Sequence, residues 1–318
     1  MIIAAGLAGG ALLILAIPTT LSATHGPQVT LEIDTERDIT INGAAPGDMA
    51  GIDVVAADVT GDGTDDLIIG AYQADPDGRD QAGQTLVLFG PLAIGTVELP
   101  ADADVIINGI DSGDQTGSGV AVGDVNNDGT GDLIIGAKQA DPGARGDAGT
   151  TYVVFGPLAS GTLELSAVVD VTINGIDAGD QSGRDVGSGD INNDGIADLV
   201  IGAFQGDPGG RGDAGETYGI FGPLASGTLE LSAVADITIN GIDAVDQSGF
   251  AVEVADVIGD GVDDIGIGAF NATAGGRASA GVTYFLFGPQ GAGVLELSAA
   301  ADLVINGIDP NDFSGSAI

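Results

Sequence analysis

An acidic motif recurs with a 66-residue period along this chain of 318 residues. Its clearest copy is DVNNDGTGDLIIGA, from Asp124 to Ala137, and the other copies begin at Asp58, Asp190 and Asp256. A second motif, Phe-Gly-Pro, keeps the same step and begins at residues 89, 155, 221 and 287. Because chance rarely keeps one period across four copies, each repeat is one supersecondary unit and the chain is an array of such units.

One repeat contains short apolar segments that are typical of β-strands. In the second copy these are residues 120–123, 133–137, 151–155 and 170–175, with the segment Gly161-Thr162-Leu163-Glu164-Leu165 before the last of them. The Leu-Ile-Ile and Tyr-Val-Val-Phe runs are apolar on both faces, as in a sheet that a neighbour covers on each side. Four-stranded antiparallel sheets stacked face to face form a β-propeller, so we predict an all-β propeller with one blade for each repeat.

Other repeat folds fit less well. The coils of a parallel β-helix are much shorter than this repeat, and the chain lacks the tryptophan that WD40 blades carry. A glycine precedes each of the last three acidic loops, at residues 117, 183 and 249. Two interpretations of these glycines stay open: a turn, or close approach of inner strands near the propeller axis.

The composition limits the possible partners. Forty-seven acidic residues against seven basic ones give a net charge of −40, which argues against binding to nucleic acid or to anionic lipid. The acidic excess suits a saline or calcium-rich extracellular setting, and an ordinary acidic secreted protein is the alternative. With no cysteine there is neither a disulfide framework nor thiol chemistry. Despite the length, the internal repetition leads us to expect one domain.

The two ends of the chain carry their own signals. Residues 1–17 contain no charge, which predicts a signal peptide over residues 1–23 or an N-terminal membrane anchor, and export in both cases. Residues 30–33 and 41–43 match residues 294–297 and 305–307 in sequence and phase. We therefore expect residues 24–318 to hold about four and a half blades of a larger ring, with an incomplete repeat from about residue 302.

The acidic loops have the pattern of a cation site. Residues 58–66, 124–132, 190–198 and 256–264 each read D-x-x-x-D-G-x-x-D. Three carboxylates within nine residues repel one another unless a hard cation lies among them, and oxygen ligands favour Ca²⁺ over transition metals. An EF-hand would place glutamate at position 12, where this chain has isoleucine in an apolar strand. The alternative is a plain Asp/Asn/Gly turn without metal.

The predicted calcium ligands occupy five positions of each loop. Positions 1, 5 and 9 supply carboxylates, position 3 supplies a side-chain oxygen, and position 7 supplies its backbone carbonyl. Loop four lacks the position 3 ligand because Ile258 stands there, so its site is weaker. The ligands are Asp58, Thr60, Asp62, Thr64 and Asp66 in loop one; Asp124, Asn126, Asp128, Thr130 and Asp132 in loop two; Asp190, Asn192, Asp194, Ile196 and Asp198 in loop three; and Asp256, Asp260, Val262 and Asp264 in loop four.

These motifs resemble the FG-GAP repeats of integrin α-subunit β-propellers and their bacterial relatives. The resemblance covers about residues 40–318 and is most specific from Gly117 to Ala137. It implies a seven-bladed propeller, calcium in the hairpin loops, and adhesion or ligand recognition outside the cell. The chain departs from the family pattern at the end of the Gly-Ala motif (Gly136-Ala137-Lys138), in its number of blades, and at Ile258.

Two further observations bear on function. Arg145-Gly146-Asp147 and Arg211-Gly212-Asp213 spell RGD, but only the arginine recurs in all four copies, so we expect these arginines to bridge local carboxylates. No nucleophile has a recognisable base partner, and His25 is the only histidine, so we predict no catalysis. Two functions remain: a secreted or surface-attached calcium-binding module that recognises a protein or glycan, and the non-catalytic propeller of a larger extracellular enzyme.

Overall fold

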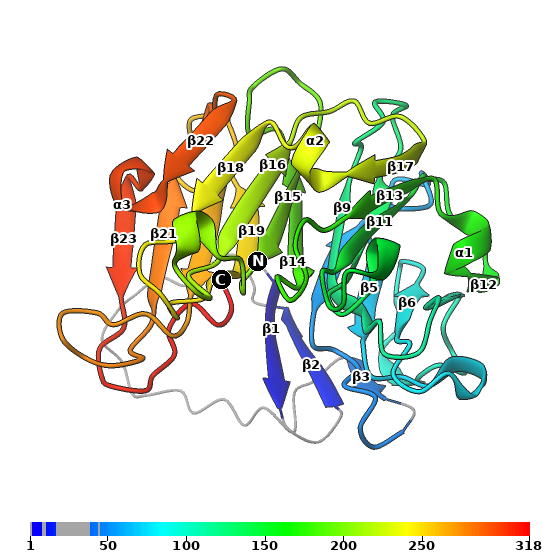
Figure 1. Cartoon of the computed structure of the whole chain (residues 1–318). Coiled ribbons are helices and arrows are strands. Elements are labelled where there is room, and N and C mark those ends of the chain that lie inside the picture. Colours follow the sequence, from blue (N-terminus) through cyan, green and yellow to red (C-terminus); the bar gives the residue numbers. More distant parts are fainter. Residues whose placement is uncertain (1, 8–10, 17–38, 44) are drawn as a thin grey trace, which may run out of the picture.

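The computed structural model describes residues 2–7, 11–16, 39–43 and 45–318. Four of its sheets are blades that follow one another along the chain and lie side by side (Figure 1). In each blade the inner, second, third and fourth strands are antiparallel neighbours. The all-β propeller prediction is therefore confirmed, and the strands of the second repeat lie where the sequence placed them.

The blades are named by their order along the chain, and equivalent strands keep the period of the repeat. The inner strands are β4 (Val54–Ala57), β9 (Thr116–Gly123), β14 (Ser182–Gly189) and β19 (Ser248–Ala255). The second strands are β5 (Asp66–Ala71), β10 (Asp132–Ala137), β15 (Asp198–Ala203) and β20 (Asp264–Ala269). The third strands are β6 (Gln84–Leu88), β11 (Thr150–Val154), β16 (Glu216–Ile220) and β21 (Val282–Leu286), and the fourth are β8 (Val105–Asn108), β13 (Val171–Asn174), β18 (Ile237–Asn240) and β23 (Leu303–Asn306).

Blades 1 to 3 have a fifth strand that the following repeat supplies. This strand pairs parallel with the fourth strand, so that Gly161 lies opposite Val105 and Glu164 opposite Asn108. A single turn of α-helix then leads the chain back into its own blade. The fifth strands are β12 (Gly161–Glu164), β17 (Gly227–Glu230) and β22 (Gly293–Glu296), and the turns are α1 (Leu165–Val168), α2 (Leu231–Val234) and α3 (Leu297–Ala300).

A further sheet at the N-terminal side has the order β1-β2-β3-β7. Its strands β3 (Ile39–Asn42) and β7 (Gly95–Glu98) pair parallel, like a fourth and a fifth blade strand. β1 (Ile2–Leu7) and β2 (Ala11–Ala16) pair antiparallel and extend the sheet beyond β3. Much of the predicted leader (residues 1–23), His25 and residues 30–33 lie outside the described residues, and the leader stays a prediction.

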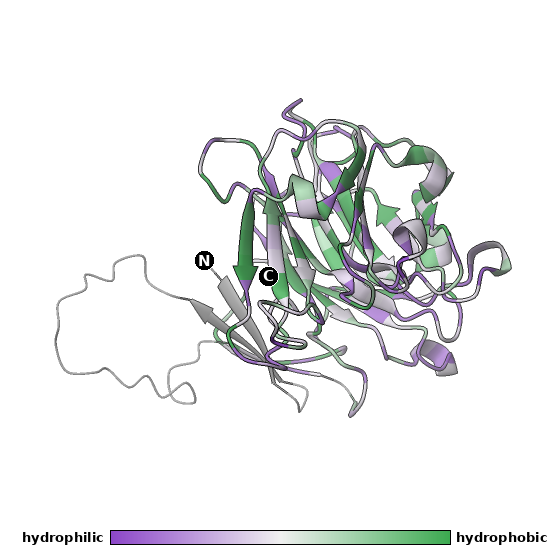
Figure 2. Ribbon diagram, turned by 60° about the vertical axis from the view of Figure 1, so that its left-hand side comes forward, coloured by the Kyte–Doolittle hydropathy of each residue, from purple (hydrophilic) through white to green (hydrophobic). Residues whose placement is uncertain are grey.

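The core lies between neighbouring blades. In β10, Leu133 and Ile135 pack with Ile68 of blade 1, whereas Ile134 packs with Leu199 of blade 3, and all of these side chains are buried. Alternate residues of one strand thus enter two different clusters. Figure 2 shows the result, with apolar residues along the strands and polar residues along the connecting loops. The two-faced apolar runs of the sequence are explained by this arrangement.

Paired glycines allow neighbouring blades to approach closely. In blades 1 to 3, the glycine that precedes the last residue of the second strand faces the glycine near the start of the next inner strand. A Cβ added to Gly136 would lie 2.0 Å from the carbonyl oxygen of Gly183, which itself has a φ of +78°. Gly117 and Gly249 occupy the equivalent place in their blades, with φ of +84° and +81°. These glycines therefore serve two purposes: they allow the close approach of neighbouring blades, and they adopt the left-handed backbone conformation.

The remaining regular elements are short. Three 3₁₀ turns follow the second strands: η1 (Pro76–Gly78), η2 (Pro142–Ala144) and η3 (Pro208–Gly210). Within the described residues, no helix has the length and apolar character that crossing a membrane requires.

Replacement of Gly136 by alanine should destabilise the propeller by about 1–3 kcal/mol, because the new methyl group would push against the backbone of the next blade. Gly146→Ala is the matched control, since no atom lies within 4 Å of the added Cβ there. Urea denaturation of the two variants measures the difference. Equal free energies of unfolding would contradict the interpretation that this glycine is needed for blade packing.

Candidate functional site

The four acidic loops connect inner to second strands, so all of them lie at the same end of their blades. Each closes a hairpin whose second strand begins at the ninth loop residue: Asp66, Asp132, Asp198 or Asp264. The predicted hairpin setting of these loops is therefore confirmed. Positions 4 to 6 of each loop are exposed, whereas the ninth residue is buried in all four loops and the second is buried in loops one to three.

The first aspartate of each loop accepts hydrogen bonds from the loop backbone. Asp124 accepts from the N–H of Asp128 through Oδ1 and from that of Gly129 through Oδ2, both at 2.9 Å. Asp58 accepts from Gly61 and Gly63, both at 2.7 Å. The hydrogen bond from the N–H of Gly63 is the main cause of the lowered pKa of the Asp58 carboxyl. The first aspartate thus folds the loop around its own side chain. The equivalent aspartates of the other two loops are Asp190 and Asp256.

The ninth aspartate joins the loop to the Phe-Gly-Pro turn. Asp132 accepts from the N–H of Val125 through Oδ2 at 3.0 Å and from that of Gly156 through Oδ1 at 3.0 Å. Burial raises the pKa of Asp132 to about 6. This second contact was not predicted from the sequence, although the common period of the two motifs was a signal for it. The same pair of contacts is made by Asp66, Asp198 and Asp264.

Position 3 differs between the loops, whereas position 5 is aspartate in all four. In loop two, Asn126 Nδ2 donates to Asp128 Oδ2 at 2.9 Å and to Asp132 Oδ1 at 3.3 Å, so three predicted ligands come together. Loop three repeats the contacts through Asn192, Asp194 and Asp198. In loop one the Thr60 hydroxyl donates instead to Asp58, and in loop four Ile258 is 47% exposed and carries no oxygen.

The position 7 residues donate their N–H groups to the position 5 carboxylates: Thr64 to Asp62, Thr130 to Asp128, Ile196 to Asp194 and Val262 to Asp260. Across the described residues, no three His, Cys, Asp or Glu side chains are grouped closely enough to hold a metal ion. The donor set nevertheless consists of oxygens and suits a hard cation. Loops two and three have the fuller set.

A cavity of about 610 Å³ lies where the four inner strands meet. Asp53 and Asp185 face it from the inner strands and accept from the N–H groups of Val120 and Val252 in the next blades, at 2.6 and 2.9 Å. Burial, and then repulsion by Asp53, raises the pKa of Asp185. Arg184 also lines the cavity, and its guanidinium lies 4.2 Å from the centre of the Phe250 ring.

Aromatic and cationic side chains gather at the blade end opposite the acidic loops. Most of them directly follow the second strands, at the period of the repeat, or lie near the start of the inner strands. Lys138 lies 4.4 Å from the centre of the Tyr72 ring, and the Phe250 ring lies 5.3 Å from that of Phe204 and 4.1 Å from that of Phe270. Together with Arg184 and Phe313, these residues form what we call the aromatic arc: Tyr72, Lys138, Arg184, Phe204, Phe250, Phe270 and Phe313.

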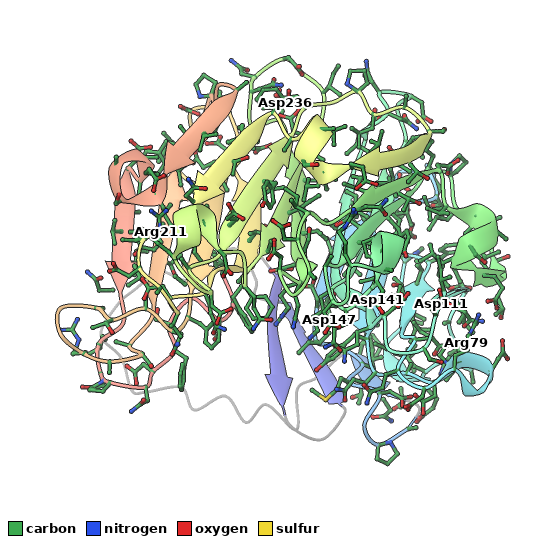
Figure 3. The ribbon with its side chains drawn as sticks, in the orientation of Figure 1. Arg79, Asp111, Asp141, Asp147, Arg211 and Asp236 are labelled. Carbon is green, nitrogen blue, oxygen red and sulfur yellow. The ribbon has the colours of Figure 1, made fainter. Side chains whose placement is uncertain are left out.

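The arginines of the two RGD sequences bridge local carboxylates, as predicted. Arg145 lies 2.7 Å from Glu230 and Arg211 lies 2.9 Å from Glu296, and each glutamate belongs to a fifth strand. Asn174, on the fourth strand, donates to Glu230 at 2.8 Å. We call this set of one Arg, one Asn and one Glu the edge clamp; blade 1 forms it with Arg79, Asn108 and Glu164. In Figure 3, Asp141 and Asp147 lie well below Asp236, which accepts the N–H of Phe221 in a Phe-Gly-Pro turn.

The family comparison agrees with the repeat geometry. The family model "FG-GAP repeat" matches residues 50–88, 116–154 and 182–220, which run from the inner to the third strand of blades 1 to 3. The chain carries FG-GAP repeats. Such repeats indicate a β-propeller, in agreement with the five sheets described above. The fourth copy, whose loop contains Ile258, lies outside the matched residues.

Curated relatives of these FG-GAP repeats fall into two groups. Mouse phosphatidylinositol-glycan-specific phospholipase D is 30% identical over 203 residues, which are 63% of this chain and 24% of the mouse protein. The bovine protein of the same name is 34% identical over 55% of this chain and 20% of its own length. Integrin alpha pat-2 of Caenorhabditis briggsae is 30% identical over 71% of this chain and 18% of its own. The chain thus spans about a quarter or less of the relatives it matches.

Three aspartates at the 3₁₀-turn end of the blades, Asp114 and Asp180, which are buried, and Asp246, which is half-buried, were not predicted from the sequence. Burial is the main cause that raises the pKa of Asp114 and Asp246 to about 6 and that of Asp180 to about 7. Like charges add to the effect, with Asp111 and Asp141, both labelled in Figure 3, acting on Asp114. Asp177, Glu216 and Asp207 act on Asp180 in the same way.

Acidification from pH 8 to pH 5 should stabilise the metal-free protein. A carboxyl whose folded pKa exceeds its unfolded value binds more protons when folded, so stability is lost as the pH rises through the folded pKa. Asp180→Asn should raise the free energy of unfolding at pH 8 by on the order of 1 kcal/mol, because solvent screens part of the repulsion, and should change it little at pH 5.

Asp77→Asn is the control, because its side chain is 78% exposed. Urea denaturation at the two pH values in EDTA measures the effect. A stability curve of the same slope for Asp180→Asn and the unchanged protein would contradict the assignment.

Proposed function

We propose that this chain is a calcium-stabilised FG-GAP propeller that recognises a protein or a glycan outside the cell. The observation that carries the calcium proposal is the recurrent oxygen donor set of the loops, with positions 3, 5 and 9 brought together in loops two and three. Residues of positions 1, 3, 5 and 9, with the position 7 carbonyl, would hold the ion. Bound Ca²⁺ would neutralise carboxylates that otherwise repel one another.

Recognition outside the cell is supported by the comparisons and the charge. The relatives include integrin α subunits, and the net charge of −40 argues against nucleic acid and anionic membranes as partners. The aromatic arc offers flat apolar rings and two cations beside the axial cavity, at the end of the blades away from the calcium loops. We propose this end as the binding face, because aromatic rings contribute large contact energies in recognition surfaces.

The second candidate function is the ancillary propeller of a larger extracellular enzyme. The observation that favours it is the match to phosphatidylinositol-glycan-specific phospholipase D, in which the matched region is about a quarter of an enzyme. A propeller in that role would bind the substrate or its surroundings and leave catalysis to another part of the protein. In both functions this chain itself is non-catalytic.

Calcium should raise the thermal midpoint and EDTA should lower it. With a dissociation constant of roughly 10⁻⁴ to 10⁻³ M, about 10 mM Ca²⁺ stabilises by about 1.4–2.7 kcal/mol for each occupied loop. Asn126→Ala should reduce this gain because it removes a ligand from loop two. Ile258→Ala is the matched control at the same position of loop four and should leave the gain unchanged. Identical midpoints in Ca²⁺ and EDTA, with no metal found by elemental analysis, would refute calcium binding.

Binding to a ligand should depend on the aromatic arc. Extracellular-matrix proteins and an immobilised glycan library, each screened in Ca²⁺, distinguish adhesion from ancillary glycan binding. Phe250→Ala should weaken capture of whichever ligand is found at least tenfold, since it removes the ring on which Arg184 stacks. Ile94→Ala is the control, because Ile94 is 80% exposed and follows a Phe-Gly-Pro turn at the other end of the blades. The thermal midpoint of Phe250→Ala shows whether the variant is folded. Undiminished capture by the folded variant would rule out this face.

A further inference from the structure

The repeat places a pair of side chains where each blade meets the next, at the blade end opposite the acidic loops. One residue directly follows the second strand, and the other is the third residue of the next inner strand. Between blades 3 and 4 this pair is Phe204 and Phe250, whose ring centres lie 5.3 Å apart. Between blades 2 and 3 it is Lys138 and Arg184. Two cations thus occupy a place that two apolar rings can fill, so the fold itself does not require charge there.

These two cations have no carboxylate partner among the residues that the structure describes. The ion pairs of that part of the chain are made by other arginines. Lys138 lies over the Tyr72 ring instead, at 4.4 Å from its centre, and Arg184 lies 4.2 Å from the centre of the Phe250 ring. Such contacts attract a cation without neutralising it. With 47 acidic residues against seven basic ones in the sequence, two neighbouring cations that lack an acidic partner are an exception.

The charge of this pair is held in partly buried surroundings. Lys138 and Arg184 are both half-buried. Burial, and then the charge of Arg184, lowers the pKa of Lys138 to about 8, so the ammonium form still prevails at pH 7. Arg184 also acts on Asp53 and Asp185 of the axial cavity. Burial raises the pKa of both carboxyls, which favours their protonated forms and leaves the charge of Arg184 less compensated.

Amide groups accompany the rings and cations along the aromatic arc. Gln181 and Gln247 directly precede the inner strands of blades 3 and 4, and both are half-buried. One repeat after Gln247 the same place is held by Phe313, whose ring lies 6.0 Å from that of Phe270. An amide both donates and accepts hydrogen bonds, as the hydroxyl groups of a sugar require. Aromatic rings add flat apolar area, which matches the C–H face of a sugar ring.

The charge of the whole chain restricts the kind of anion that can bind. At a net charge of −40, the rest of the surface repels a ligand that carries many negative charges. One carboxylate is different, because two cations at hydrogen-bonding distance attract it more strongly than acids beyond a Debye length, about 10 Å at 0.1 M salt, repel it. The guanidinium of Arg184 fits a carboxylate with two parallel hydrogen bonds, and the Lys138 ammonium adds a further donor. The site therefore suits a single, isolated carboxylate.

We propose that Lys138 and Arg184 bind the carboxylate of an acidic sugar unit, and that the rings and amides beside them bind the sugar ring and its neutral neighbours. This inference rests on the proposed function, which places ligand binding at the aromatic arc, and it narrows the ligand to a glycan with isolated carboxylates. A peptide carboxylate would meet the same two cations. The rings and amides that run from Tyr72 to Phe270 favour a chain of ring-shaped, hydroxyl-bearing units instead.

Sugars that differ only in one carboxylate test the assignment. The probes are the methyl glycosides of glucuronic, galacturonic and mannuronic acid, each compared with its neutral parent sugar. Saturation-transfer NMR titrations of the full chain at pH 7 in Ca²⁺ measure the dissociation constants. At least one acid should bind about tenfold more tightly than its parent, the effect of one charge-assisted contact. Lys138→Gln and Arg184→Gln should each remove most of this difference and leave the affinity for the neutral sugar within about twofold.

Two further variants separate charge from packing. Lys138→Arg keeps the cation and should retain the affinity for the acid within about twofold. Arg145→Gln is the matched control, because it changes the net charge by the same amount but removes a cation that is bound to Glu230 in an edge clamp. Its affinity for the acid should equal that of the unchanged protein. Thermal midpoints establish that each variant is folded.

Three outcomes would overturn the proposal. Equal affinities for the acids and their neutral parents, with binding lost in Phe250→Ala, would refute the carboxylate site and leave the binding face in place. Binding of none of the six sugars would refute it as well, and the matrix and glycan screens would then test the binding face on their own. Tighter binding of N-acetylglutamate α-amide than of any sugar acid, with loss in Lys138→Gln, would show that the site takes an acidic peptide.

Discussion

Apolar packing between neighbouring blades is the interaction on which the rest of the structure depends. A four-residue strand such as β13 cannot bury Val171 and Ile173 within its own sheet, and both are buried only because blade 3 covers them. The packing requires the blades to approach until the Cβ position of Gly136 meets the backbone of Gly183. The glycine content and the two-faced apolar strands are thus two consequences of one requirement.

The fifth strand fixes the register in which each blade pairs with the next repeat. Sheet edges of blades 1 to 3 are closed by a strand from the next repeat, so each blade is joined to its successor by hydrogen bonds as well as by the chain. A slip by one residue would turn Glu230 away from Asn174 and Arg145, because strand side chains alternate between faces. Each exposed ion pair contributes only about 0.2–1 kcal/mol, so the edge clamp selects the register more than it stabilises the fold. Four of the six described cations, Arg79, Arg145, Arg211 and Arg277, occupy equivalent positions beside such edges.

Much of this fold could be predicted from the sequence because the period multiplies weak signals. Four copies made the strands, the hairpin position of the acidic loops and the bridging role of Arg145 predictable from residue types alone. The fifth strand was not predicted as part of the preceding blade, because its pairing of Glu164 with Asn108 spans 56 residues and leaves no local pattern. The raised pKa of Asp180 was equally out of reach, since it depends on which acidic side chains the fold brings beside it.

The positions of the acidic loops can be separated by the contacts that they make. Positions 1 and 9 bind loop backbone: Asp124 holds the N–H of Gly129, and Asp132 holds those of Val125 and Gly156. These contacts hold the hairpin and join it to the Phe-Gly-Pro turn in every blade. Position 5 is aspartate in every loop and accepts the position 7 N–H, whereas position 3 differs, with threonine in loop one, asparagine in loops two and three and Ile258 in loop four. The fold therefore accounts for Asp256 and Asp264 beside Ile258, and under the calcium proposal position 3, where loop four lacks an oxygen, would separate a cation-binding loop from a structural one.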